Sequence, residues 1–70
     1  NKRLLPLQVK KGSINNNDPI TSNNVEIGKV LIANKFSFAL IKFKDKEFEY
    51  NKEFKCGKAN IEILKPNWLN

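Results

Sequence analysis

Few residues of this chain carry side chains that commonly act in catalysis. Cys56 is the only cysteine, and the sequence contains no histidine. Lys55 and Lys58 lie near Cys56 and would lower its pKa, which favours a nucleophilic thiolate. The alternative is a buried structural thiol, and we favour it because Cys56 shares the strand parity of Phe54. The sequence therefore predicts no catalytic centre within these residues.

The other side chains that could take part in binding or catalysis do not indicate a particular chemistry either. Asp45, Glu47, Glu49 and Glu53 gather near one predicted hairpin, but lysines alternate with them, which indicates a solvated face. With no histidine and one cysteine, a zinc site made by this chain alone is excluded. The glycines are isolated, so there is no phosphate-binding loop. Trp68 either stacks on a flat ligand or closes the end of a small barrel, and the second is favoured.

The chain has a formal net charge of +6, which allows two interpretations. A basic patch would bind nucleic acid. A solvated lysine-rich surface is favoured instead, because Lys and Arg together number 13 and only Arg3 is an arginine. We therefore expect nucleic-acid binding to be the weaker alternative.

The first part of the chain predicts a strand and then a loop. Residues 3–9 alternate apolar side chains with a period of two, which is typical of a strand. Pro6 cannot donate a hydrogen bond to a sheet, so we expect this strand to be an edge strand or to start at a bulge. Residues 10–19 contain glycine, three asparagines and Asp-Pro, which predicts a mobile loop.

The remaining elements are predicted from their turns. Asn23-Asn24 suits a hairpin turn that needs positive φ angles. A second hairpin is expected at Asp45-Lys46 and a further turn near Asn51-Lys52, followed by one bent strand or two short ones in residues 54–64. No segment carries a helical apolar stripe. The sequence therefore predicts an all-β fold, a small antiparallel barrel of about six short strands.

Gly28 marks a change of phase in an otherwise regular strand. Val25 and Ile27 share one parity, whereas Val30 and Ile32 share the other. A β-bulge absorbs one extra residue and bends its strand, and glycine tolerates that geometry. We therefore expect a bulge at Gly28 rather than only a weak point in the strand.

Residues 36–43 are apolar on both faces. Phe36, Phe38 and Leu40 lie on one parity, and Ala39, Ile41 and Phe43 on the other. One face can fill a barrel, but the other needs a cover. The cover is either a neighbouring domain or partner, which we favour, or the chain's own Ile14 or Trp68. If the face stays uncovered, weak self-association is expected.

The ordered set of short motifs resembles a known family. The motifs are KRL at 2–4, IGKV at 27–30, FALI at 38–41, and Gly57, Ile61, Ile63, Pro66 and Trp68 at the end. In this order they are similar to the C-terminal barrel of the YgfZ-type folate-binding proteins. That family is related to the glycine-cleavage T-protein, an aminomethyltransferase.

The resemblance implies a function for a longer parent protein. It implies that residues 1–70 are one domain, the C-terminal barrel of a larger chain, and the lack of an initial Met agrees. Tetrahydrofolate would be bound mainly by the preceding domains of the parent chain, which would be the barrel's partners. The parent would support iron–sulfur cluster assembly or repair, or would be aminomethyltransferase-like. Lys2 and Arg3 either face the folate cleft and pair with its glutamate carboxylates, or are ordinary charges at the end of a strand, which we favour.

The sequence also predicts the cellular compartment of the protein. One cysteine allows no disulfide within the chain, which favours a reducing, cytoplasmic compartment. No apolar run approaches the ~20 residues that span a bilayer, so no membrane association is expected. The alternative function is a small basic barrel that binds RNA or single-stranded nucleic acid.

Overall fold

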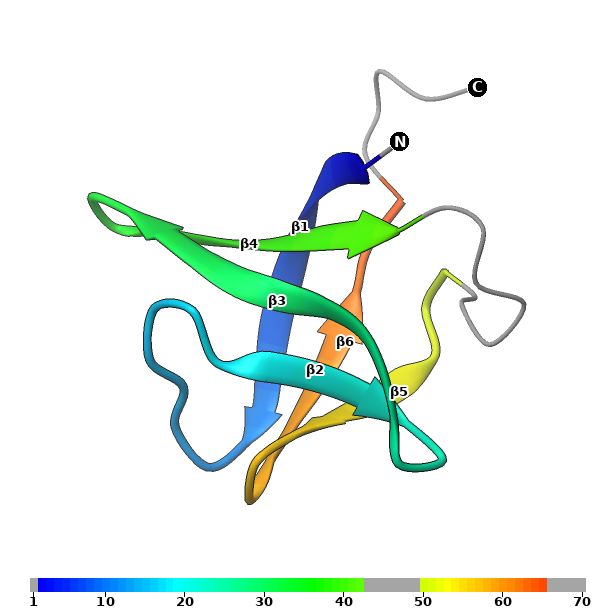
Figure 1. Ribbon diagram of the computed structural model, residues 1–70. Helices are drawn as coiled ribbons and strands as arrows, with labels where there is room; N and C mark the ends of the chain where they lie inside the picture. The colour runs from blue at the N-terminus through cyan, green and yellow to red at the C-terminus, as the bar shows by residue number, and fades with distance from the viewer. Residues whose placement is uncertain (1, 43–49, 66–70) are drawn as a thin grey trace.

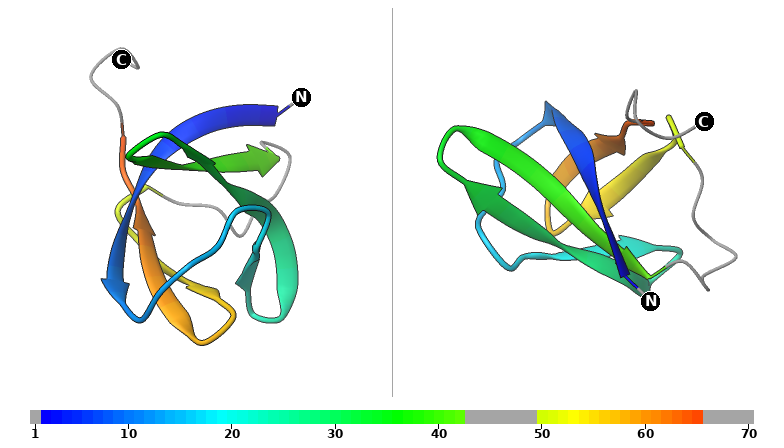
Figure 2. Two further views of the ribbon diagram at one scale, coloured as in Figure 1. Left: turned by 90° about the vertical axis from the view of Figure 1, so that its left-hand side faces the viewer. Right: turned by 90° about the horizontal axis from the view of Figure 1, so that it is seen from above.

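The computed structural model describes residues 2–42 and 50–65, and their regular secondary structure consists only of strands. The six strands are β1 (Lys2–Lys11), β2 (Pro19–Ser22), β3 (Val25–Ala33), β4 (Phe36–Lys42), β5 (Glu53–Cys56) and β6 (Ala59–Ile63). They pair antiparallel and close into a barrel in the order β1-β4-β3-β2-β5-β6 (Figures 1 and 2). The predicted small antiparallel barrel of about six strands is confirmed.

The barrel interior is filled by one apolar cluster. Alternate residues of each strand point inward, as the pleat requires. The largest fully buried side chains are those of Leu5, Ile20, Ile27, Ile41, Ile61, Ile63, Val30 and Cys56. Glu62 points away from this cluster, between two buried isoleucines, as the alternation predicted.

β1 closes the barrel because it pairs with two strands in succession. Its first half pairs with β4, from Lys2 to Pro6, and its second half pairs with β6 from Leu7 onward. The predicted edge strand is therefore wrong, since a closed barrel leaves β1 no free edge. The Pro6 carbonyl accepts the Leu64 N–H at 2.9 Å. The nitrogen of Pro6 points to the same side as its carbonyl, toward Leu64, which lies just past the end of β6. The ladder between β1 and β6 stops there, so no N–H donor is required from Pro6.

The predicted bulge is present in β3. Ile20 pairs with Gly28 and Thr21 pairs with Glu26, so Ile27 is the extra residue. Both Ile27 and Val30 are fully buried although their parities differ. The bulge lets both side chains enter the core and bends β3 around the barrel.

Asparagine and glycine occupy the turns at positive φ. Asn23 (51°) and Asn24 (66°) form the β2–β3 turn, which confirms that prediction. Later turns also use this region, at Asn34 (56°), Asn51 (62°) and Gly57 (62°). β5 and β6 are two paired strands rather than one bent strand. The hairpin predicted at residues 45–46 lies outside the described residues.

The asparagine-rich loop is shorter than predicted, because β1 extends to Lys11 and β2 begins at Pro19. Residues 16–18 lie along β3, beyond the point where β2 begins. Three hydrogen bonds join them to β3, from Asn17 N–H to Val30 O (2.7 Å), from Val30 N–H to Asp18 O (2.8 Å) and from Ile32 N–H to Asn16 Oδ1 (2.8 Å). The end of the loop therefore continues the pairing of β2 with β3. The predicted mobility of the loop stays a prediction.

Candidate functional site

Cys56 lies inside the barrel rather than on a reactive surface. Its side chain is buried in the core cluster, and it carries no disulfide. Burial raises the pKa of the Cys56 thiol, and the nearby Asp18 carboxylate raises it further. Lys55 and Lys58 therefore do not activate it, and the interpretation as a structural thiol is confirmed.

The raised pKa of Cys56 predicts a pH dependence of stability. The unfolded thiol ionises at its ordinary pKa, whereas the folded thiol resists ionisation. Its contribution to stability is thus present below the ordinary thiol pKa, about 8.5, and is lost as pH rises through the raised value. Urea unfolding at pH 7 to 10 should show a steeper loss of the free energy of unfolding for the wild type than for Cys56→Ala. Parallel curves for the two proteins would contradict this expectation.

The predicted acidic cluster is only partly described. Glu53 is exposed and lies opposite Glu62 across β5 and β6. Glu62 pairs with Lys10 on β1, at 3.7 Å from Nζ to Oε1. Asp45, Glu47 and Glu49 lie outside the described residues. Within residues 2–42 and 50–65, no three His, Cys, Asp or Glu side chains form a group that could hold a metal ion.

Three lysines from neighbouring strands surround a small pocket on the outside of the barrel, here called the lysine pocket. Lys2 (β1), Lys42 (β4) and Lys29 (β3) line it, and its volume is about 130 Å³. Lys2 and Lys42 are directly opposite each other, and Lys29 is opposite Leu40. The pocket is completed by Glu26, Gly28 and Leu40.

The charges of the lysine pocket favour an anion. Like charges directly opposite each other across two strands repel, and among residues 2–42 and 50–65 Glu26 is the only carboxylate that lines the pocket. A bound carboxylate or phosphate would relieve the repulsion between Lys2 and Lys42 and accept their hydrogen bonds.

The two predicted cleft residues, Lys2 and Arg3, separate in the structure. Lys2 lines the lysine pocket, whereas Arg3 is not among the pocket's lining residues. Arg3 lies opposite Ile41 and shares the parity of the buried Leu5. Sequence reasoning did not single out Lys29 and Lys42, because only the pairing of β1, β4 and β3 brings them to Lys2.

An apolar surface adjoins the lysine pocket along the same three strands. This outer apolar face consists of side chains that point away from the core, those of Leu4, Pro6, Leu31, Phe36, Phe38 and Leu40. Leu4 lies opposite Leu40, and Phe38 lies between Pro6 and Leu31. Leu40 belongs both to the face and to the pocket wall. The two features therefore form one continuous surface.

The outer apolar face is substantially accessible. Phe36 is 66% exposed and Leu4 is 44% exposed, whereas Ala39 and Ile41 on the inner side of β4 are fully buried. The prediction that β4 is apolar on both faces is confirmed by this division. Ile14 packs against the inner core cluster, so it is not the cover of the outer face. Trp68, the other candidate, lies outside the described residues.

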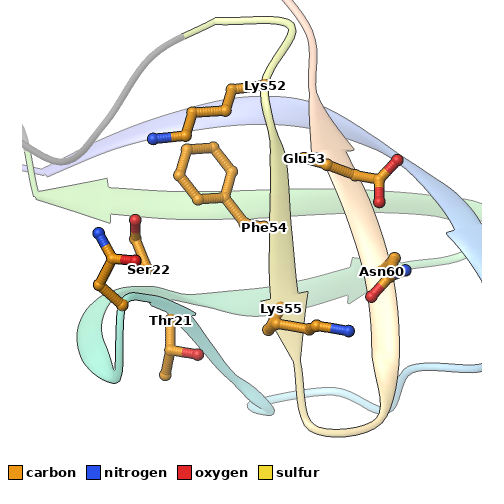
Figure 3. A pocket seen from close by; sticks show the side chains of 8 residues that line it. Thr21, Ser22, Lys52, Glu53, Phe54, Lys55 and Asn60 are labelled. Carbon is orange, nitrogen blue, oxygen red and sulfur yellow. The ribbon is translucent and has the colours of Figure 1, made fainter.

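A second cavity, of about 250 Å³, lies where the barrel is least tightly joined (Figure 3). β2 and β5 share a single pair, Thr21 with Lys55. Lys52 lies over the Phe54 ring, with Nζ 5.6 Å from its centroid. The Asn60 Oδ1 atom is buried and has no hydrogen-bond partner in the part of the chain that the structure describes. Cationic, anionic and neutral polar groups all line this cavity, so its lining does not specify one class of ligand.

Comparison with known proteins gives one match. Residues 1–70 match the family described as CAF17, C-terminal beta-barrel domain. Neither the curated proteins nor the solved structures contain a match. The described residues contain no helix long and apolar enough to span a bilayer.

Proposed function

Since the chain belongs to the CAF17 C-terminal β-barrel domain family, we propose that it is the C-terminal barrel of a folate-binding protein that supports iron–sulfur cluster assembly or repair. The barrel has no catalytic centre of its own. It contributes one wall of the folate cleft, and the preceding domains of the parent chain supply most of the tetrahydrofolate contacts. The resemblance to YgfZ-type proteins supports folate binding, and the lysine pocket is the observation that carries the proposal.

The chemistry of the lysine pocket suits the anionic end of folate. The glutamate tail of tetrahydrofolate carries carboxylates, and the ammonium groups of Lys2, Lys29 and Lys42 can each donate hydrogen bonds to them. The side chain of Leu40 gives the pocket an apolar wall for the methylene groups of the tail. Arg3 lies outside this set, so in our proposal Lys2 keeps the predicted role and Arg3 does not.

Neutralising the lysine pocket should weaken folate binding. In the full-length parent protein, Lys29→Gln or Lys42→Gln should lower the affinity for tetrahydrofolate about twofold to fivefold, the range expected for a partly exposed ion pair. Added salt should reduce the difference from wild type. Lys58→Gln is the matched control, because Lys58 is exposed in the β5–β6 turn. Calorimetric titration measures the affinity of all three variants for tetrahydrofolate. If the two pocket variants bind as tightly as Lys58→Gln, the role of the pocket is contradicted.

The cellular part of the proposal has a separate test. Cells that lack the parent protein should lose activity of iron–sulfur enzymes, and the wild-type gene should restore it. Full activity of those enzymes without the parent protein would contradict this part alone. The single cysteine is consistent with a reducing compartment, and we propose a cytoplasmic location.

One observation favours the alternative of nucleic-acid binding. Phe36 and Phe38 lie on the same outer surface as the three pocket lysines, so bases could stack there beside positive charge. The same full-length protein should then bind single-stranded oligonucleotides at low salt, with an affinity that falls as salt rises. Binding without salt dependence, or none, removes this alternative.

A further inference from the structure

The cavity between β2 and β5, here called the seam cavity, lies in the wall of the barrel (Figure 3). Side chains of both parities line it: Ser22 and Phe54 belong to the inner parity, and Thr21, Glu53 and Asn60 belong to the outer parity. Both parities reach one cavity only where two neighbouring strands separate, because paired strands lie only about 4.8 Å apart. The seam cavity is therefore a gap between strands.

β2 and β5 separate because β2 ends in a turn. Thr21 lies opposite Lys55, and continuing this antiparallel register would place Asn23 opposite Glu53. Asn23 is the first residue of the β2–β3 turn and has φ 51°, so the chain leaves the sheet there. Glu53 still belongs to β5 and lines the gap. β5 therefore extends beyond the end of its partner strand.

The main chain of Glu53 faces the seam cavity. The β5–β6 turn has two residues, so Cys56 and Ala59, which flank it, form a hydrogen-bonded pair. Bonded and non-bonded pairs alternate along antiparallel strands, so Lys55 directs its N–H and C=O away from β6, toward Thr21. Glu53, two residues earlier, has the same orientation. The described part of the chain places no strand residue opposite Glu53 on that side.

Two polar side chains add further hydrogen-bonding groups to the seam cavity. The Oδ1 atom of Asn60 is buried, and no described residue donates a hydrogen bond to it. A buried acceptor without a donor is unfavourable, so a ligand that supplies an N–H there gains affinity. Ser22 is only 7% exposed, and its hydroxyl can both donate and accept.

We propose that the seam cavity binds an extended peptide segment of a partner protein, whose main chain pairs with that of Glu53. Strand addition of this kind is a common mode of peptide recognition. Each peptide unit carries one donor and one acceptor, so the segment can satisfy both groups of Glu53 and supply an N–H to Asn60. All six described strands are already used in the barrel, so a partner protein provides the segment.

The main-chain groups select a peptide, although the side-chain charges around the cavity select no ligand class. A free anion or a nucleic-acid phosphate would accept from the Glu53 N–H but would leave the Glu53 C=O and the Asn60 Oδ1 without donors. The volume of about 250 Å³ is smaller than the roughly 300 to 1,000 Å³ of pockets for drug-sized ligands. No residue of the seam cavity lines the lysine pocket, so the proposal goes beyond folate binding and does not depend on it.

The first test compares two substitutions at Glu53. Random heptapeptides are selected on the full-length wild-type protein, and those that bind Glu53→Pro equally well are removed. Proline lacks the N–H that faces the cavity, and the ladder with β6 loses no hydrogen bond. Glu53→Thr is the matched control, because it removes the same carboxylate but keeps the N–H. The selected peptides should bind Glu53→Pro about threefold to tenfold more weakly than Glu53→Thr, the effect of one hydrogen bond.

The second test leaves the protein unchanged. Each selected peptide is methylated on one main-chain nitrogen at a time, and its affinity for the wild-type full-length protein is measured. Only alternate N–H groups of a paired strand face its neighbour, so methylation should weaken binding at every second residue. Recognition by side chains alone would not give this period of two. Hydrogen exchange at Ile61 reports whether Glu53→Pro is folded, and if it is not, the methylation pattern decides alone.

Three results would overturn the peptide proposal. The first is that no peptide binds the wild type more tightly than a folded Glu53→Pro protein. The second is that methylation weakens binding without a period of two. The third is that a single-stranded oligonucleotide, rather than any peptide, loses affinity in Glu53→Pro, which would assign the cavity to nucleic acid. None of these measurements uses folate, so failure of this proposal and failure of the proposed function are distinguishable.

Discussion

Replacing Gly28 with alanine should destabilise the barrel by about 3 kcal/mol or more, the upper part of the range for overpacking a core. A Cβ atom at Gly28 would lie 2.3 Å from the Leu40 carbonyl oxygen and 2.8 Å from Ile41 Cδ1. The first of these is a backbone atom of the paired strand β4, so a rotamer change cannot relieve the contact. A domain of this size has a free energy of unfolding of roughly 4 to 10 kcal/mol, so the loss would be a large part of it.

Gly57→Ala is the control that separates steric contact from backbone conformation. Gly57 has φ 62°, and a Cβ atom there would have nothing within 4 Å. The expected cost is therefore only that of the left-handed conformation, about 1 kcal/mol. Equilibrium urea unfolding of both variants gives the comparison. Equal losses in the free energy of unfolding would show that β3 and β4 leave enough room at Gly28 for a Cβ atom.

The bulge at Gly28 could be predicted because its cause is local in the sequence. The apolar side chains change parity between Ile27 and Val30, and a strand can keep both inside only by adding one residue. The turn at Asn23-Asn24 was predictable for the same reason, since asparagine tolerates positive φ. Local rules therefore determined the bends and turns of the barrel.

The order of the strands could not be predicted in the same way. β1 pairs with β4 and then with β6, and these partners lie far from it in the sequence. Pro6 indicated an edge strand when only its missing N–H was considered. Closure of the barrel placed that position just past the end of β6, where the ladder needs no donor.

The candidate site was only partly predictable, because it depends on register. Lys2 was identified through the family resemblance, together with Arg3. A shift of one residue between β1 and β4 would have put Arg3 on the outer surface and Lys2 on the inner parity. The observed register pairs Lys2 with Lys42 and so selects Lys2, Lys29 and Lys42 as one group.

The two faces of β4 should respond differently to truncation. Ile41 is fully buried in the barrel, so Ile41→Ala should cost about 2 to 5 kcal/mol, the usual range for a buried isoleucine. Leu40 is half-buried on the outer side, so Leu40→Ala in the isolated 70-residue chain should cost about 1 kcal/mol. Urea unfolding monitored by circular dichroism measures both variants.

The comparison becomes decisive when Leu40→Ala is also made in the full-length parent. If the preceding domain covers the outer face, Leu40 becomes buried there. Its truncation should then cost about 2 kcal/mol or more, because it would leave a cavity at the interface. The cost of Ile41→Ala should stay the same in both proteins, because the barrel core does not change. An equal cost of Leu40→Ala in both proteins would mean that Leu40 stays half-buried in the full-length protein, and the second apolar face of β4 would then need another explanation.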